Sequence, residues 1–272
     1  MISIPGCSTD LTPHDHPSIS VHGQECCGKT RLAATAPGPI GLLAIDKKSR
    51  RTFQEVAGKL GTEVVVNQKP FVTDKEAIEM ALLSGDNAAG LTKIKATYTG
   101  VVERVFDTAM RLAEHPDIRT VVIDTCSQLF EFILYSHFGR RNQIQPTSRG
   151  AANQDLIDLV NALRSKNLVL IHRSKEIWKS TGQVDRDGKP VKEPSGRFEH
   201  DGFKNIGGFM TATIELTSRR TKTDDLESKF RAKVVTSQSN VLLEGQDLHD
   251  YGISGENITW SNIMTILGLE DE

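Results

Sequence analysis

The chain has 272 residues, a formal net charge of −2, 25% charged residues and 38% hydrophobic residues. These values are ordinary for a globular protein with one large α/β domain, and they exclude nucleic-acid binding driven by overall positive charge. The longest apolar runs, VVID and LVLI, have the length of strands, which excludes a membrane-spanning helix.

Residues 1–17 contain three prolines among polar residues and predict a flexible leader. This segment lacks the basic and apolar regions of a secretion signal. The cysteines show no CxxC spacing, and Cys7 with His14 and His16 matches no compact zinc pattern. We therefore expect a reduced protein of the cytoplasm.

Strand-like and helix-like segments alternate along the chain as far as residue 173. Strands are predicted where short apolar runs occur, at 18–23, 41–46, 63–67, 119–125 and 168–173. Helices are predicted from propensity and apolar spacing at 29–36, 51–60, 74–85, 101–115, 130–138 and 155–167, with a looser region at 85–100. This alternation predicts an α/β fold with a mostly parallel sheet flanked by helices.

Two long polar loops interrupt the pattern, at about 137–154 and at 174–205. The second exceeds ordinary loop lengths, so we expect a functional excursion, with a hairpin at DRDGK as one form that it can take. Strand-like runs follow at 210–219, 229–237 and 240–245, before a short helix near the end of the sequence. The predicted organisation is a core at 18–217 and a β-rich extension of the same domain at 218–272.

The stretch GQECCGKT fits the phosphate-loop pattern G-x-x-x-x-G-K-[ST] at every fixed position, between a predicted strand and a predicted helix. Glycines let the backbone turn its N–H groups toward phosphate oxygens, and the helix adds the positive end of its dipole. A Gly-rich turn that matches by chance, at about one in a hundred for a chain of this length, is the alternative. The predicted nucleotide-binding residues are Gly23, Gln24, Glu25, Cys26, Cys27, Gly28, Lys29, Thr30 and Arg31.

Within this loop Lys29 is expected to reach the β- and γ-phosphates, and the Thr30 hydroxyl to bind Mg²⁺. The adjacent Cys26 and Cys27 occupy variable positions of the pattern, where the backbone matters more than the side chain. A thiol beside Lys29 and a helix N-terminus would have a lowered pKa, so redox control of nucleotide binding is a secondary hypothesis.

Two further strand ends supply candidate residues. Asp124 ends an apolar strand and is expected beside the Mg²⁺ bound by Thr30, either as a ligand or through a water molecule. His172 ends the next strand and is interpreted as a γ-phosphate sensor, because ligands of such sheets bind at the carboxyl ends of the strands. The alternative for His172 is a histidine that is simply hydrogen-bonded at a strand end.

The sequence resembles the RecA-like P-loop ATPases, particularly the short phage and prophage proteins of single-strand annealing or recombination. The matching segments are GQECCGKT, APGPIGLLAID, RTVVIDTCSQLFEFI, NLVLIHRSKEIW and GGFMTATIEL, which lie within residues 18–217. The resemblance implies ATP and Mg²⁺ as cofactors and action on DNA in phage recombination or replication. It further implies a homo-oligomeric ring or filament, a phage single-strand-binding protein as a partner, and the cytoplasm of a bacterial host.

One position departs from the family. Its members commonly carry a catalytic Glu two residues after the Asp that ends the second strand, and this chain has Lys48 there, after Asp46. A lysine cannot orient and deprotonate the attacking water as a carboxylate does. Asp46 is the favoured substitute, Glu131 on the helix after Asp124 is the second, and slow hydrolysis is the third possibility.

Candidate DNA-binding residues lie in the two long loops. Basic side chains that contact the backbone, together with aromatic rings that stack on bases, are typical of single-strand binding. The candidates are Arg140, Arg141, Arg149, Lys175, Trp178 and Lys179. An ordinary solvated loop is the alternative, because acidic residues are interspersed among them. Three functions therefore stay open: a DNA-stimulated ATPase, a nucleotide-dependent binding module with little hydrolysis, and a P-loop kinase whose lid is the segment 174–205.

Overall fold

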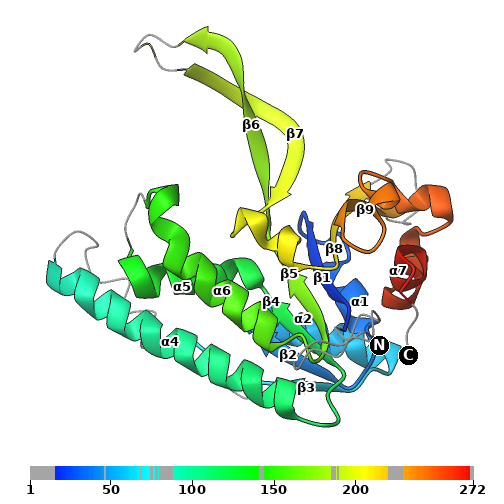
Figure 1. Ribbon diagram of the computed structural model, residues 1–272, viewed down its shortest axis with the longest axis horizontal. Helices are drawn as coiled ribbons and strands as arrows, with labels where there is room; N and C mark the ends of the chain where they lie inside the picture. The colour runs from blue at the N-terminus through cyan, green and yellow to red at the C-terminus, as the bar shows by residue number, and fades with distance from the viewer. Residues whose placement is uncertain are drawn as a thin grey trace, which may run out of the picture.

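The computed structural model describes residues 16–45, 47–67, 69–73, 76, 79, 88–140, 144–184, 188, 190–219 and 229–269. A seven-stranded sheet forms its centre, in the order β3-β2-β4-β5-β1-β8-β9 (Figure 1). The strands are β1 (Ser18–Gly23), β2 (Ile40–Ala44), β3 (Val64–Val66), β4 (Thr120–Asp124), β5 (Asn167–Ile171), β8 (Ala212–Arg219) and β9 (Lys229–Ser237). Every pairing is parallel except that of β8 with β9. The predicted α/β class with a mostly parallel sheet is confirmed.

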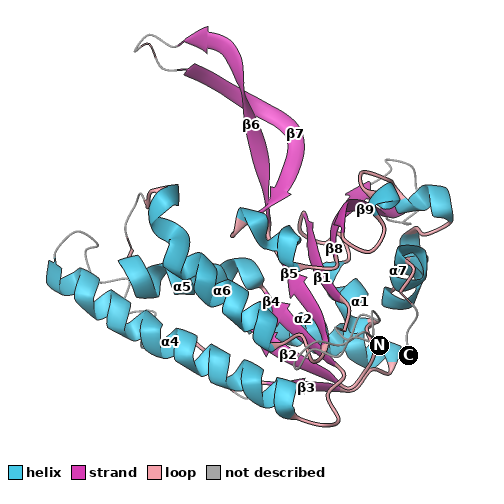
Figure 2. Cartoon of the chain, viewed as in Figure 1, coloured by secondary structure: helices cyan, strands magenta, loops and turns pink. Residues whose placement is uncertain are grey.

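Helices cover both faces of this sheet (Figure 2). The helices are α1 (Lys29–Ala34), α2 (Lys47–Leu60), α4 (Ala88–Glu114), α5 (Cys126–Phe138), α6 (Gly150–Ala162) and α7 (Trp260–Leu267). On one face, α1, α2 and α7 contribute Leu32, Phe53 and Trp260 to a core that also contains Ile19 of β1. On the other face, α4, α5 and α6 bury their apolar sides against β4 and β5. Because the central strands are covered on both faces, their sequences are continuous apolar runs.

The prediction of a loose region at 85–100 is wrong for residues 88–100, because helix α4 begins at Ala88. It contains Gly90 and Gly100, each of which costs about 1 kcal/mol relative to alanine in a helix interior. Burial of Ile94, Tyr98 and Val101 on one helical stripe offsets that cost. The predicted helix at 74–85 falls mainly outside the described residues.

The polar segment 174–205 forms an antiparallel ribbon of two strands, β6 (Ser174–Val184) and β7 (Pro190–His200). It rises from the carboxyl edge of the main sheet and stands clear of both helical layers (Figure 1). The expectation of a loop is therefore wrong for most of this segment, and a hairpin is present. The strands were concealed because charged residues stand at neighbouring positions, such as Lys175 and Glu176, so the sequence shows no alternation of apolar and polar residues.

The other differences concern element ends and short turns. The first predicted loop, 137–154, contains the 3₁₀ turn η1 (Pro146–Arg149), and α6 begins inside it at Gly150. The run 240–245 is not a strand but the 3₁₀ turn η3 (Val241–Leu243). Its neighbours still pair with β9, since Val234 N donates to Gln246 O at 3.0 Å and Gly245 N donates to Val234 O at 2.8 Å. This pairing protects part of the sheet edge.

The segment after β9 continues the same core. Two more 3₁₀ turns, η4 (Leu248–Tyr251) and η5 (Gly255–Asn257), lead to α7. The backbone N–H of Trp260 donates to Thr35 Oγ1 at 2.8 Å, which joins the start of α7 to the end of α1. Within the described residues no helix is long and apolar enough to cross a membrane.

The substitution Trp260→Ala tests this packing, because the indole has no exposed surface. We expect the free energy of unfolding to fall by about 3–5 kcal/mol, the usual cost of removing a large aromatic side chain from a core. Urea denaturation in dilute solution, followed by circular dichroism, measures the change. Leu242→Ala, at a position that is 87% exposed, is the control and should change stability by less than about 0.5 kcal/mol. Equal effects of the two substitutions would contradict the position of α7.

Candidate nucleotide-binding site

The turn between β1 and α1 begins at Gly23, where the backbone conformation and the lack of space allow only glycine. Gly23 has φ +153°, and a Cβ atom there would lie 2.2 Å from Leu216 O and 2.6 Å from Cys27 Sγ. Gly28, at the N-cap of α1, has φ +94°. Positive φ values are costly for residues that carry a side chain. Both fixed glycines of the pattern are therefore required by the geometry of the turn.

The Lys29 side chain folds back across this turn. Its ammonium group donates hydrogen bonds to Gly23 O at 2.6 Å and to Gln24 O at 2.7 Å. These bonds hold the positive charge beside the backbone of the loop. The arrangement combines a cation, a glycine-rich turn and the start of a helix, which together suit phosphate groups.

The two cysteines differ in their environment. Cys26 is exposed and has φ +59°, whereas Cys27 is 1% exposed and lies under the loop. Burial raises the pKa of the Cys27 thiol, and the nearby Lys29 ammonium only partly opposes that shift. The hypothesis of an activated thiol is therefore wrong for Cys27, because the cost of removing a thiolate from water exceeds the attraction of the lysine.

Asp124 is brought level with the phosphate loop by the register of three neighbouring strands. It pairs with Ile171 of β5, and Ile171 pairs with Val21 of β1, two residues before Gly23. Asp124 shares its face of the sheet with Val122, which packs in the same core as Leu32 of α1. The carboxylate is 4% exposed. It therefore lies on the side of the sheet on which α1 and Thr30 lie.

The donor atoms at this position fit Mg²⁺. The Thr30 hydroxyl and the Asp124 carboxylate are hard oxygen ligands, and Mg²⁺ at phosphate sites takes only one or two protein ligands besides phosphate and water. Among the residues that the structure describes, no cluster of three or more His, Cys, Asp or Glu side chains is placed to hold a metal ion. A Mg²⁺ ion held by the Thr30 and Asp124 oxygens would complete its coordination with phosphate and water oxygens.

Three histidines meet on the other face of the sheet, beside the root of the ribbon. They are His22 at the end of β1, His172 after β5, and His200 at the end of β7. The ring centroid of His200 lies 5.3 Å from that of His172 and 6.0 Å from that of His22. We name these residues the histidine cluster. Sequence reasoning found only His172, although the alternation in SISVHG places His22 on the face opposite Val21.

Burial lowers the pKa values of two members of the histidine cluster, His22 and His172. The pKa of His22 is lowered to about 4, mainly by burial and to a smaller extent by the neighbouring His200 and Lys29. Burial likewise places the pKa of His172 well below its ordinary value, and His200 and His22 act in the same direction. Neither ring nitrogen of His172 makes a well-formed hydrogen bond to a described residue, although the Asp201 backbone is near enough to oppose the shift weakly.

The root of the ribbon is bonded to the helix that follows Asp124. Ser127 Oγ accepts a hydrogen bond from Arg173 N at 3.0 Å and donates one to Asp201 O. Glu131 Oε2, one turn further along α5, lies 2.9 Å from Arg173 Nη2. The second candidate carboxylate for catalysis is thus engaged in an ion pair. Asp46, the favoured candidate, lies outside the described residues, whereas Lys48 is part of α2.

The candidate DNA-binding residues are dispersed. Arg140 stacks over the Tyr135 ring at 5.8 Å, and Arg149 donates to Ile144 O at 3.2 Å, while Arg141 lies outside the described residues. On the ribbon, Trp178 is 57% exposed. Two of the ribbon lysines are paired: Lys175 lies within 3.7 Å of carboxylates of Glu199 and Asp201, and Lys179 lies within 3.1 Å of Glu193. These pairs reduce the positive field that a nucleic acid would meet.

No protein-family model matches the chain, and no curated protein matches it. Solved structures do match, among them a prototypical ATPase from the type III secretion system of pathogenic bacteria, with a TM-score of 0.42 and 10% sequence identity. The match covers 75% of this chain and 51% of that one, so this chain spans about half the length of that ATPase. Similarity at this level assigns no function, and the nucleotide site rests on its own geometry.

The histidine cluster predicts how stability depends on pH. The pKa values of His22 and His172 are lower in the folded chain than in the unfolded chain, so below about pH 6.5 the unfolded chain binds more protons. We expect the free energy of unfolding to be constant above about pH 7 and to fall between pH 6.5 and 5 by up to about 1.4 kcal/mol per pH unit for each histidine.

Urea denaturation at several pH values measures this slope. His172→Asn should remove about half of it, because one of the two depressed groups is lost. Thr213→Ala, at a position that is buried and does not titrate, controls for a general loss of stability and should leave the slope unchanged. An unchanged slope in His172→Asn would show that the imidazole is not held neutral.

Proposed function

We propose that the protein is a P-loop ATPase of the RecA-like type that binds and hydrolyses Mg·ATP. The main support for this proposal is that the glycine-rich turn and Asp124 lie at the same edge of the sheet. Asp124 pairs with Ile171 of β5, and Ile171 pairs with Val21, two residues before the turn. The backbone N–H groups of residues 23–31, with Lys29, would bind the phosphates. Thr30 and Asp124 would hold Mg²⁺, which neutralises charge on the β- and γ-phosphate oxygens when bound.

We propose Asp46 as the carboxylate that orients and deprotonates the attacking water. It directly follows Ile45 in the sequence, and the backbone N–H of Ile45 donates to Asp124 O at 2.7 Å. The ion pair of Glu131 with Arg173 disfavours the other candidate, because it holds that carboxylate against the guanidinium.

The role of His172 as a γ-phosphate sensor stays a proposal. A buried neutral imidazole can donate one hydrogen bond, as a sensor requires. The rings around His172 belong to His22 and His200, so a link between the phosphate loop and the ribbon root is the competing role.

We further propose that the protein acts on single-stranded DNA in phage-type recombination or replication, as a homo-oligomer that hydrolyses ATP. We propose that the strand crosses the segment that carries Arg140 and Arg149. The start of α6, next to Arg149, lies toward the same edge of the sheet as the ribbon (Figure 1). Guanidinium groups there can contact phosphates without competing for the nucleotide.

A second candidate function is a binding module that uses ATP without appreciable turnover. Lys48 in place of the usual glutamate favours it, together with the ion pair that engages Glu131. Such a module would bind Mg·ATP as tightly as the ATPase does, so only the rate of phosphate release separates the two.

The substitution Lys29→Ala tests nucleotide binding. It removes the ammonium that lies within the loop, and we expect the affinity for Mg·ATP to fall about 100-fold or more, since hydrogen bonds to charged groups are the strong ones. Isothermal titration calorimetry measures this affinity. Lys59→Ala, at an exposed lysine of α2, is the control and should bind as the wild type does. Tight binding by Lys29→Ala would overturn the assignment of the loop.

Phosphate release with and without a single-stranded oligonucleotide tests the DNA proposal. We expect turnover to rise with the oligonucleotide, and Arg140→Ala with Arg149→Ala to weaken DNA affinity while basal turnover is kept. Each lost phosphate contact should lower the slope of log affinity against log salt by about 0.7. Arg51→Ala, on α2, is the control.

The outcomes separate the candidate functions. ATP binding without turnover in either condition would favour the binding module. Turnover that needs a small phosphate acceptor instead of DNA would indicate a kinase.

A further inference from the structure

A phenyl ring lies beside the phosphate loop, and none of the nucleotide contacts proposed above uses it. A Cβ atom added at Gly28 would lie 3.7 Å from Cδ1 of Phe230 and 3.9 Å from its Cε1. Phe230 is the second residue of β9, and part of its surface is exposed. An aromatic ring with an open face at the edge of a polar loop can bind a flat apolar group of a ligand.

The sheet places this ring on the face that carries α1. Phe230 pairs with Ser218 of β8, and two residues away Ala232 pairs with Leu216. Residues two apart in a strand share a face. Leu216 and Ala232 lie in the core that contains the buried side of α1, and Phe230 packs against that core. The ring therefore lies on the α1 side of the sheet and near the carboxyl end of β8, where ligands of such sheets bind.

The strand order gives the phosphate loop two different flanks. Strand β4, which ends at Asp124, lies on one side of β1, and β8 and β9 lie on the other side (Figure 1). In the proposed function, Thr30 and Asp124 hold a Mg²⁺ that bridges the β- and γ-phosphates, which places those phosphates toward β4. The nucleoside end of the ligand then extends toward β8 and β9. Phe230 stands on that flank.

Arg31 carries a hydrogen-bond donor on the same flank that the protein does not use. Its Nη1 lies 3.4 Å from Glu256 Oε1 in η5, in an ion pair whose side chains are 38% and 87% exposed. Its Nε is buried and makes no hydrogen bond to any residue that the structure describes. A buried N–H without a partner is costly, so an oxygen of a ligand would be bound favourably there.

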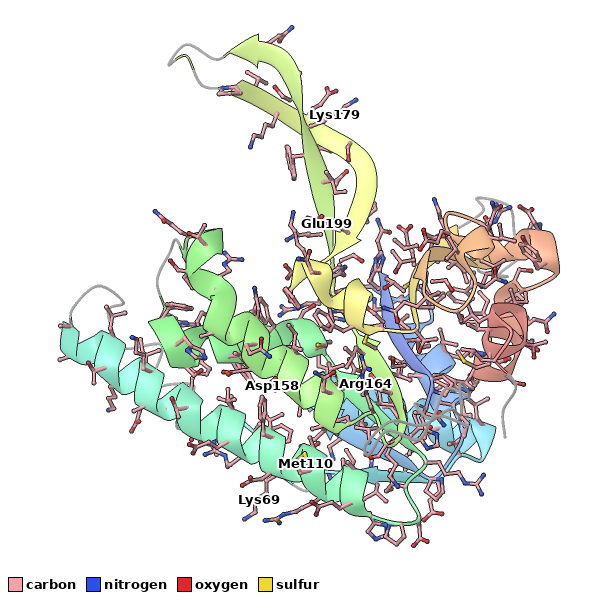
Figure 3. The ribbon with its side chains drawn as sticks, viewed as in Figure 1. Lys69, Met110, Asp158, Arg164, Lys179 and Glu199 are labelled. Atoms are coloured by element: carbon pink, nitrogen blue, oxygen red, sulfur yellow. The ribbon has the colours of Figure 1, made fainter. Side chains whose placement is uncertain are left out.

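The loop and the segment after β9 form this flank, and the ribbon does not. In Figure 3, Lys179 and Glu199 mark the ribbon, and both stand apart from β9 and from the turns that follow it. The bridge between Arg231 and Ser254 holds the chain just before η5 against β9. The ring of Phe230 and the guanidinium of Arg31 are thus positioned by neighbouring parts of one well-packed region.

We propose that Phe230 binds the base of the nucleotide by stacking, beside the unused Nε donor of Arg31, and that the substrate is a purine nucleoside triphosphate. A stacked base is bound through its face, and the two fused rings of a purine cover more of a phenyl ring than the single ring of a pyrimidine. This inference deepens the proposed function and rests on it, because the loop must first hold the phosphates.

The alternative role for Phe230 is packing alone. The ring would then fill the space between the core and Gly28, and another apolar side chain of similar size would serve as well. Leucine preserves such packing but has no π-face on which a base can stack. The two roles therefore differ in what Phe230→Leu does to nucleotide binding.

Calorimetric titration with Mg·ATP, Mg·CTP and magnesium tripolyphosphate separates the base from the phosphates. The wild type should bind ATP more tightly than it binds CTP or tripolyphosphate. Phe230→Ala and Phe230→Leu should each lower the affinity for ATP about 5- to 150-fold, the range that stacking of a base on an aromatic ring contributes. Neither should change the affinity for tripolyphosphate, and in both variants ATP and CTP should bind equally well.

Two further variants complete the experiment. Val235→Ala, at an exposed position of the same strand, is the matched control and should bind all three ligands as the wild type does. Phe230→Trp retains an aromatic face and should keep the preference for ATP. The fluorescence of Phe230→Trp should change on addition of ATP and not on addition of tripolyphosphate, which is a readout that needs no turnover.

Three results would overturn this inference and leave the proposed function intact. They are wild-type affinity for ATP in Phe230→Leu, an equal loss of ATP and tripolyphosphate affinity in that variant, and a wild type that binds tripolyphosphate as tightly as ATP. The first would show that packing suffices, and the second that the ring only supports the loop. A wild type that binds none of the three ligands would overturn the proposed function, and this inference with it.

Discussion

The contact between Gly23 and the carbonyl of Leu216 is the constraint on which the site depends. A Cβ atom at position 23 would lie 2.2 Å from that oxygen, so the end of β1 can approach β8 only because the residue is glycine. This approach fixes where the turn begins and where α1 starts. Lys29 then reaches back to the carbonyls of residues 23 and 24, which keeps its charge within the turn. The loop is thus shaped by sheet packing before any ligand binds, and such preorganisation lowers the cost of binding.

The second constraint is the position of β5 between β1 and β4. It brings Asp124 level with the phosphate loop, and its own continuation becomes the ribbon. The ribbon root is bonded on one side to Ser127 and Glu131 of α5, and it contacts His22 of β1 on the other. These contacts connect β1 and the start of α5 with the root of the ribbon.

The sequence predicted the parts of the fold that depend on local pattern. The strands around residues 20, 43, 122 and 170 were predicted because strands covered on both faces are continuous apolar runs. The phosphate loop was predicted because its glycines, lysine and threonine have fixed spacing. The predicted helix was shorter than α4, because Gly90 and Gly100 were interpreted as helix breaks. In the structure, burial of the apolar stripe of α4 offsets the helix propensity that these glycines cost.

Other features depend on contacts between distant segments and have no local signal. The ribbon lacks an apolar face, so its two strands had no period to reveal them. The histidine cluster joins residues 22, 172 and 200, which only the sheet order brings together. The raised pKa of the Cys27 thiol results from burial under the loop, which the motif itself does not specify.

The central claim is that residues 23–31 bind the phosphates of a nucleotide. Hydrogen exchange of the full chain, with and without saturating Mg·ATP, tests it most directly, since backbone N–H groups are the proposed ligands. The account predicts slower exchange at residues 24–31, with smaller effects at the end of β4 and the ribbon root. Protection confined to other parts of the chain, with residues 24–31 unchanged, would contradict it.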